Sequence, residues 1–263
     1  MAREPERRRF LRTGLGLAAL LGASGIAWLP TPAASANRLR PPGALEEQDY
    51  LSACIKCGQC VQVCPVSALK LADLGDGYGI GAPYIDARAQ ACDFSCDAVQ
   101  CILACPTGAL TYHKPTDLSI RTGMPVAQAP VLLAKKKDPE PTLNLKERMG
   151  VAVLTRPDAC LARQGKGHKG PARAAGFAGH LRFMEVDRWK PIPLNDHPFA
   201  VEICDLCVQT CPIEGAIRLV PMANGGMTPE VLEPCLGCGV CEMACPTEPA
   251  SIEIKPRQGW PHA

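Results

Sequence analysis

Two cysteine runs with identical spacing lie toward opposite ends of this chain and constrain its fold more than any other feature. Each reads Cys-x2-Cys-x2-Cys-x3-Cys-Pro, at Cys54–Pro65 and at Cys235–Pro246. This spacing is typical of 4Fe-4S ligation in bacterial ferredoxins, where the fourth cysteine ligates a neighbouring cluster. The proline after that cysteine favours an extended backbone there, which turns the fourth thiolate away from the other three. Each run therefore needs a partner run.

Two looser cysteine groups lie between these runs. The second group is Cys92–Pro106, and the third combines Cys204–Pro212 with a fourth ligand from elsewhere, for which Cys160 is the one unassigned cysteine. An isolated cysteine is also often a buried free thiol, so that alternative stays open for Cys160. The count predicts four 4Fe-4S clusters held by all sixteen cysteines: Cys54, Cys57, Cys60, Cys64, Cys92, Cys96, Cys101, Cys105, Cys160, Cys204, Cys207, Cys211, Cys235, Cys238, Cys241 and Cys245.

Zinc and disulfide bonds explain the cysteines less well. Structural zinc sites use four ligands, usually as two separated pairs, and give no reason for three closely spaced cysteines followed by Cys-Pro. Disulfide frameworks belong mainly to small secreted domains. A chain of 263 residues is long enough to bury a core without such cross-links.

The N-terminal segment predicts export. Arg7–Arg12 resembles a twin-arginine signal, an apolar stretch follows at Thr13–Leu29, and Ala34–Ala36 is an A-x-A cleavage site. We therefore expect residues 1–36 to be a signal peptide and the mature protein to reach the periplasm already folded around its clusters. The alternative is an uncleaved anchor, but about 17 apolar residues are at the lower limit for spanning a bilayer.

Composition excludes several function classes. The chain has 28 basic and 26 acidic residues, of which five arginines and two glutamates lie in residues 1–36, so the remainder is near neutral. Neither nucleic acid nor an anionic membrane surface is implied. The glycines at 75, 77, 79 and 81 do not match G-x-G-x-x-G, which argues against nucleotide binding. The five histidines are scattered, and no catalytic grouping is evident, so we expect no enzyme activity from this chain alone.

The fold class follows from a repeat around the cysteines. Each group is followed by a short β-type segment, and strands precede the third and fourth groups, at Val151–Leu154 and Glu230–Leu232. The segments that follow the groups are Ala68–Leu71, Ala109–Tyr112, Ala216–Val220 and Ser251–Ile254. This pattern predicts an α+β protein of tandem bacterial-ferredoxin-like units, each holding two clusters, with short strands, short helices and long loops.

The direction of these strands favours a nested pairing of the groups. Group one would pair with group four in an outer unit formed by 37–88 and 222–263, and group two with group three in an inner unit, 89–221. Cys245 would then complete the cluster of Cys54, Cys57 and Cys60, and Cys64 that of Cys235, Cys238 and Cys241. In the inner unit, Cys211 would join Cys92, Cys96 and Cys101, while Cys105 would join Cys160, Cys204 and Cys207. Sequential pairing, one with two and three with four, remains the alternative.

Two long insertions, 114–149 and 161–203, interrupt the proposed inner unit. They are rich in charged residues, glycine and proline. We expect solvated loops, since charge runs usually are solvated, with a docking surface for a partner as the alternative.

The whole combination resembles the NapG/MauM family of periplasmic ferredoxin-type proteins. The resemblance rests on the twin-arginine signal, the four cysteine groups, and the stretches Arg38–Ala44 and Ala82–Arg88. It implies four 4Fe-4S clusters that pass electrons between a membrane-bound NapH/MauN-like quinol oxidase and a periplasmic redox partner. The alternatives are an accessory factor that matures a partner metalloenzyme and the iron–sulfur subunit of a molybdopterin-type complex. The chain departs from the family pattern in its Cys92-x3-Cys96 spacing and in the long gap between Cys160 and Cys204.

Overall fold

The computed structural model describes residues 38–76, 79–94, 96, 99–111, 119–121, 142–144, 149–182 and 190–256. The expected signal peptide, 1–36, and most of the insertion 114–149 lie outside these residues. Within that insertion, strands β3 (Ser119–Arg121) and β4 (Thr142–Asn144) pair antiparallel.

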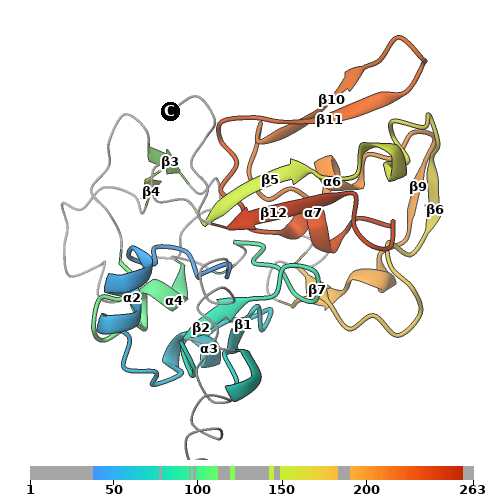
Figure 1. Ribbon diagram of the computed structural model, residues 1–263. Coiled ribbons are helices and arrows are strands. Elements are labelled where there is room, and N and C mark those ends of the chain that lie inside the picture. The colour runs from blue at the N-terminus through green and yellow to red at the C-terminus, as the bar shows by residue number, and fades with distance from the viewer. Residues whose placement is uncertain are drawn as a thin grey trace, which may run out of the picture.

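The structure has the expected class, with short helices and two-stranded antiparallel sheets arranged in two units (Figure 1). The first unit begins with the 38–46 segment and helix α2 (Glu47–Ala53), followed by α3 (Gln59–Gln62) in the first cysteine group. A hairpin of β1 (Leu69–Leu71) and β2 (Pro83–Ile85), with the 3-10 turn η1 (Leu74–Asp76) between them, leads to α4 (Gln100–Leu103) in the second group. An isolated bridge between Ala44 and Leu110 joins the start of the unit to its end.

The second unit repeats this plan. Strand β5 (Gly150–Leu154) and the 3-10 turn η3 (Pro157–Ala159) precede Cys160, and α6 (Leu206–Gln209) carries Cys207. The hairpin β10 (Ile217–Pro221) and β11 (Met227–Val231) leads to α7 (Val240–Met243). Strand β12 (Ile252–Pro256) then pairs antiparallel with β5, from Ile252 opposite Leu154 to Pro256 opposite Gly150. This sheet corresponds to the Ala44–Leu110 bridge of the first unit.

The observed pairing of groups is sequential, so the nested pairing expected from the strand directions is wrong. Helix α3 of group one packs on α4 of group two, and α6 of group three packs on α7 of group four. The division into an outer unit, 37–88 with 222–263, and an inner unit, 89–221, depended on the nested pairing and loses its basis. Strand β5 does enter group three as expected, but it pairs with the strand that leaves group four.

The insertion 161–203 is folded where the structure describes it, so the expectation of a solvated loop is wrong for those parts. Strands β6 (His168–Gly170) and β9 (Phe199–Val201) pair antiparallel and close the excursion. Between them, β7 (His180–Leu181) pairs with β8 (Ile192–Pro193), and the 3-10 turn η4 (Leu194–Asp196) follows. Leu181, Leu194 and Phe199 are buried. The pairing of β6 with β9 brings the two ends of the insertion together. The chain then reaches Cys204, whose N–H donates to the Lys166 carbonyl at 2.9 Å.

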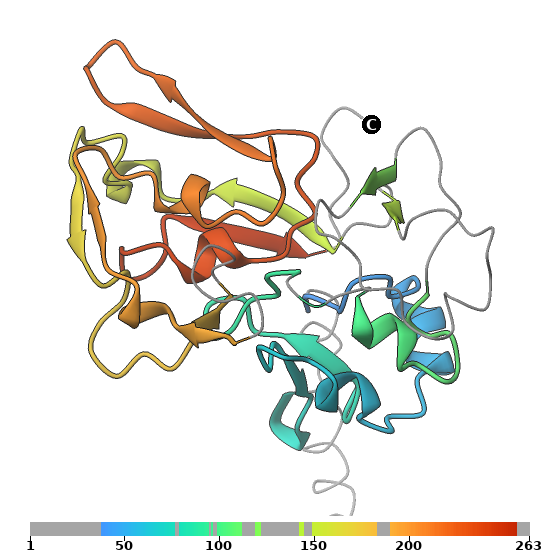
Figure 2. The ribbon, with the colours of Figure 1, turned by 180° about the vertical axis from the view of Figure 1, so that it is seen from behind.

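The two units meet along residues 87–93 of the first and 237–248 of the second. The units lie side by side in Figure 1 and, seen from behind, in Figure 2. The Cys92 N–H donates to the Cys238 carbonyl at 3.3 Å. Gly239 has φ +94° and no room for a side chain, since a Cβ would lie 2.6 Å from that of Ala87. Arg88 donates to the carbonyls of Glu242, Cys245 and Thr247, so one side chain of the first unit holds the end of α7 and the loop after it.

Part of the insertion reinforces this contact. The side chain of Gln90 exchanges two hydrogen bonds with the backbone of His180, at 2.8 and 2.9 Å. The Arg182 N–H donates to the buried carboxylate of Asp93 at 3.0 Å. The insertion is therefore packed against residues 87–93, the part of the first unit that contacts the second unit.

Candidate iron–sulfur sites

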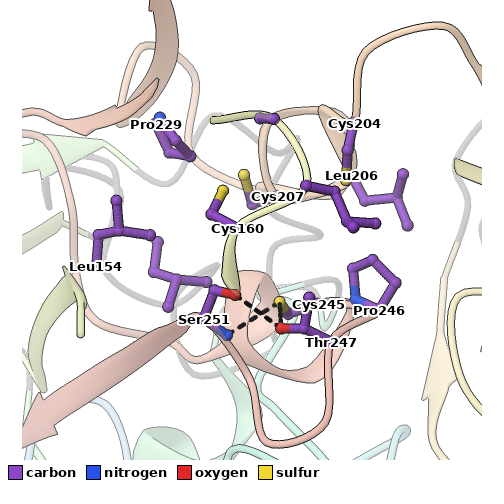
Figure 3. A pocket seen from close by; sticks show the side chains of 13 residues that line it. Leu154, Cys160, Cys204, Leu206, Cys207, Pro229, Cys245, Pro246, Thr247 and Ser251 are labelled. Carbon is purple, nitrogen blue, oxygen red and sulfur yellow. Dashed lines mark hydrogen bonds between the residues drawn. The ribbon is translucent and has the colours of Figure 1, made fainter. Parts of the chain in front are cut away.

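Four cysteines surround a cavity in the second unit, which we call site D (Figure 3). Cys160 follows η3, Cys204 precedes α6, Cys207 lies on α6, and Cys245 follows α7. The cavity has a volume of about 360 Å³ including its opening, and its wall is otherwise mostly apolar. Cys160 is thus not an isolated thiol. It contributes to the same site as Cys204 and Cys207, as the count of cysteines suggested, because β6 and β9 bring the ends of the insertion together.

Site C lies beside site D in the same unit. Cys211, Cys235, Cys238 and Cys241 line a cavity of about 330 Å³ with Ile217, Val231 and Ile254. Three of these cysteines come from group four and one from group three. Sites C and D therefore exchange their fourth cysteines, as in a two-cluster ferredoxin.

Site A is the corresponding cavity of the first unit. Cys54, Cys57, Cys60 and Cys105 line about 340 Å³ together with Tyr50 and Leu110. Cys57 is exposed, unlike the other fifteen cysteines, all of which are described.

Site B is assigned to the four cysteines that line none of the other three cavities, and the electrostatic coupling of their thiols agrees with this assignment. The pKa of Cys101 lies well above its ordinary value, first because of burial and then because of the thiolates of Cys96 and Cys64. Burial also raises the pKa of Cys92, followed by the thiolates of Cys96 and Cys101. Cys64 follows α3, which packs on the helix that carries Cys101. Site B therefore consists of Cys64, Cys92, Cys96 and Cys101.

The expected sets of ligands are corrected in their fourth member only. The structure places Cys105 with Cys54, Cys57 and Cys60, where Cys245 was expected, and Cys245 with Cys160, Cys204 and Cys207, where Cys105 was expected. Cys211 lies with Cys235, Cys238 and Cys241 instead of Cys64. Cys64 in turn lies with Cys92, Cys96 and Cys101 instead of Cys211. The physical reason is that α3 packs on α4 and α6 on α7, so each fourth cysteine reaches the nearest neighbouring group in the chain.

The thiols in these sites repel one another as thiolates. Burial raises the pKa of Cys60 to about 11, with a further contribution from Cys54. Burial likewise raises the pKa of Cys204 to about 11, and Cys245 and Cys160 add to the increase. A bound cation reverses this balance, because it deprotonates coordinating thiols outright. Groups of buried, mutually repelling thiols are therefore what a positively charged iron core would stabilise.

Hydrogen-bond donors point at the fourth cysteine of three sites. The N–H groups of Ala68, Leu110 and Ser251 donate to the sulfur atoms of Cys64, Cys105 and Cys245 at 3.3, 3.4 and 3.3 Å, respectively. The pKa of Cys105 is lowered overall. Burial, the largest influence, raises it, but the N–H groups of Leu110, Thr107 and Gly108 and the Thr107 hydroxyl together outweigh burial.

These sites fit a cluster better than a single metal ion. Among the described residues, no three His, Cys, Asp or Glu side chains are grouped as one metal ion requires. In a 4Fe-4S cluster each thiolate binds a different iron atom, so four cysteines spaced around a cavity are the appropriate donor set. This arrangement also argues against zinc, whose four ligands converge on one ion.

The sites follow one another in the order A, B, C, D. Cys60 of site A contributes to the raised pKa of Cys101 in site B, after burial and nearer thiolates. The hydrogen bond from Cys92 to Cys238 joins sites B and C. Cys207 of site D contributes to the raised pKa of Cys241 in site C, again after burial and nearer thiolates.

Other candidate features remain outside these sites. His168 bonds through Nε2 to the Pro171 carbonyl oxygen at 2.9 Å, and His197 packs edge-on against Phe199. His113 and His262 lie outside the described residues. Sequence reasoning did not single out the hydroxyls of Thr107 and Thr247, which lie near the sulfur atoms of Cys105 and Cys245. The repeated Cys-Pro-Thr sequence was the signal that could have revealed them.

Comparisons with known proteins agree with these cysteine groups. Residues 53–109 match a family described as a 4Fe-4S dicluster domain, and residues 232–248 match a 4Fe-4S binding domain. The first match covers groups one and two together, in keeping with their observed pairing. No solved structure is similar enough to count as a match. No helix among the described residues has the length and apolar character needed to cross a membrane.

Several curated proteins are similar over nearly the whole chain. The methylamine utilization ferredoxin-type protein MauM of Methylobacillus flagellatus is 34% identical over 97% of this chain and 86% of its own length. MauM of Paracoccus denitrificans is 34% identical over 92% of this chain and 83% of its own. The ferredoxin-type protein NapG of Escherichia coli is 34% identical over 95% and 85%, respectively. With this similarity and its cysteine-lined cavities, the chain belongs to the NapG/MauM family of ferredoxin-type iron–sulfur proteins.

Proposed function

We propose that this protein is a periplasmic electron carrier with four 4Fe-4S clusters, one in each of sites A to D. The observation that carries the proposal is the order of the sites, in which each neighbours the next and the middle contact is the Cys92–Cys238 hydrogen bond. An ordered series of redox sites is useful for moving electrons across a molecule. Membership of a ferredoxin-type family supports the same role.

All sixteen cysteines are the proposed ligands, four to each cluster. The clusters supply one-electron exchange, and the protein sets their potentials through burial, charge and hydrogen bonds to sulfur. Because every iron atom would have a cysteine ligand, no coordination position is left open for a substrate. We therefore propose that any catalysis belongs to a partner protein.

The proposed partners are a membrane-bound quinol oxidase of the NapH/MauN type and a periplasmic oxidoreductase system. The expected twin-arginine signal in residues 1–36 supports a periplasmic location. Some relatives are named for methylamine utilization, which makes methylamine oxidation one candidate for the system served. Exposure of Cys57 supports electron exchange with a partner at site A.

The test is a redox titration of the purified, anaerobically handled protein followed by EPR, together with reduction by isolated membranes. We expect about sixteen iron atoms per chain, four for each cluster, and reduction when the membranes are supplied with quinol. Failure of quinol-supplied membranes to reduce any cluster contradicts the proposal. A deletion strain that loses maturation of a partner metalloenzyme, with electron flow to the mature enzyme unchanged, favours an accessory role instead.

A further inference from the structure

The second residue after each fourth cysteine differs between the outer and the inner sites. At sites A and D it is a threonine, Thr107 after Cys105 and Thr247 after Cys245. At sites B and C it is an aliphatic residue, Val66 after Cys64 and Ile213 after Cys211. A hydroxyl is therefore available at this position in the outer sites alone.

In site D the hydroxyl is within hydrogen-bonding distance of the ligand sulfur (Figure 3). The Thr247 Oγ1 lies 3.2 Å from the Cys245 Sγ and 2.8 Å from the Ser251 Oγ. A cysteine sulfur bound to iron carries no proton, so Thr247 must be the donor in its bond to Cys245. Its oxygen can then accept from the Ser251 hydroxyl. The series of hydrogen bonds therefore runs in one direction, from the Ser251 hydroxyl to Thr247 and from the Thr247 hydroxyl to the Cys245 sulfur.

Hydrogen bonds to the backbone of Thr247 and Ser251 hold these donors in place. The Thr247 carbonyl accepts a hydrogen bond from Arg88 at 2.7 Å. Ser251 is 2% exposed, its N–H donates to the Cys245 sulfur, and its carbonyl accepts the Arg156 N–H at 3.1 Å. Two donors from one short loop thus reach a single sulfur in a buried environment, where hydrogen bonds polarise one another.

The other sites show weaker versions of this arrangement. In site A the Thr107 Oγ1 lies 3.7 Å from the Cys105 Sγ, at an exposed position. In site B the Cys64 sulfur accepts from the Ala68 N–H, and the nearby Val66 has no hydroxyl to add. At the second residue after the fourth cysteine, a hydroxyl therefore lies closest to the sulfur in site D and farther away in site A, and this residue has no hydroxyl in sites B and C.

We propose that Thr247, oriented by Ser251, raises the reduction potential of the cluster held in site D. Reduction adds negative charge to the cluster and its sulfur ligands, and a hydrogen-bond donor aimed at a ligand sulfur stabilises that charge. Thr247 is a positioning and tuning residue, not a ligand. This inference rests on the proposed function, because it requires a cluster in site D.

The test is a redox titration followed by EPR on the full, cluster-loaded protein. The midpoint that disappears in Cys160→Ala is assigned to site D. We expect Thr247→Val, which keeps the shape and removes the hydroxyl, to shift that midpoint downward and leave the other three in place. Thr247→Ser should restore most of the shift, and Ser251→Ala should give a smaller downward shift of the same midpoint. Thr107→Val is the matched control, expected to move only the site A midpoint, and by less.

Several results would overturn the inference. An unchanged site D midpoint in Thr247→Val, with iron content unchanged, removes the role of the hydroxyl. Equal shifts of all four midpoints point to a general structural effect and equally contradict it. If Thr247→Val loses the cluster, Ser251→Ala decides, because an unchanged midpoint there rejects the proposed chain of donors. Each of these outcomes is distinct from failure of the proposed function, in which membranes fail to reduce clusters that are present.

Discussion

The backbone N–H of Cys92 donates a hydrogen bond to the carbonyl oxygen of Cys238 at 3.3 Å, directly between two ligand-bearing loops of different units. Cys92 belongs to site B and Cys238 to site C, so this bond lies at the middle of the series of four sites. The Asp93 carboxylate adds to the raised pKa of both thiols, after burial and nearer thiolates. The contact between the units is therefore also the contact between their inner sites.

Gly239→Val tests this contact. A side chain at this position would meet Ala87 and Ala91, and the backbone φ of +94° disfavours any residue but glycine. We expect a loss of about 1–3 kcal/mol in unfolding free energy, as for overpacked interiors. EPR of the fully reduced protein should also show weaker magnetic interaction between clusters B and C. Gly225→Val is the matched control, at a left-handed glycine with open space around it and outside the cysteine-lined cavities. Unaltered interaction and stability in Gly239→Val would show that the units do not meet here.

An ion pair between buried Arg40 and half-buried Glu47 supports the wall of site A. Arg40 is 1% exposed, bonds Glu47 through Nε and Nη2, and stacks over Tyr50, a residue that lines the cavity. We expect Arg40→Met to cost about 3 kcal/mol of unfolding free energy, the lower end for breaking a buried pair, because Glu47 can still be hydrated.

The exposed pair between Arg218 and Glu230 is the matched control for this prediction. Arg218→Met should cost at most about 1 kcal/mol, as exposed ion pairs usually contribute little. Denaturant unfolding of both variants measures the difference. Equal losses would mean that burial of Arg40 has no special role in stability.

Removal of iron should loosen both units. The helices that carry the cysteines are single turns, and the groups of thiols around the cavities repel one another once ionised. Because metal binding is coupled to folding in small metal-dependent folds, we expect a chelator under reducing conditions to lower the far-UV circular dichroism and to expose the chain to protease. An apoprotein with native circular dichroism and native protease resistance would contradict this coupling.

The proposed export signal lies in residues 1–36, outside the described residues. We predict that replacing Arg7 and Arg8 by lysine leaves uncleaved precursor in the cytoplasm, since lysine keeps the charge but lacks the paired guanidinium groups. Cell fractionation and the size of the protein on a gel measure this outcome. Mature protein in the periplasm of cells that carry the double variant would exclude the twin-arginine route.

The cysteine groups and most of the short strands beside them could be predicted from the sequence because their signals are local, whereas the expected strand at Ala109–Tyr112 is only an isolated bridge at Leu110 where the structure describes it. Val151–Leu154 was expected as a strand and lies within β5, and the expected strand Ser251–Ile254 lies in β12 from Ile252 onward. Their pairing could not be predicted, because a strand that enters one group and a strand that leaves another are compatible with several partners. The choice depends on which helices pack together between groups. Helices of a single turn have too few residues for their sequences to indicate their packing partner.

The folded insertion was missed for a related reason. Strand β6 has the sequence His-Lys-Gly, which has little intrinsic preference for a strand, and it forms because Phe199–Val201 lies opposite. The buried contacts of the insertion with Gln90 and Asp93 are tertiary as well. From the sequence, Cys160 could be assigned to a site only by counting cysteines. In the structure, the pairing of β6 with β9 brings Cys160 to the same cavity as Cys204 and Cys207.

The most direct test of the account compares Cys245→Ala with Cys160→Ala by iron analysis and EPR. Although these residues are far apart in the sequence, both line site D. We predict that each variant loses the same EPR signal and about four iron atoms, one whole cluster, while the signal removed by Cys54→Ala persists in both. Loss of the Cys54 signal in Cys245→Ala would restore the nested pairing and contradict the sites described above.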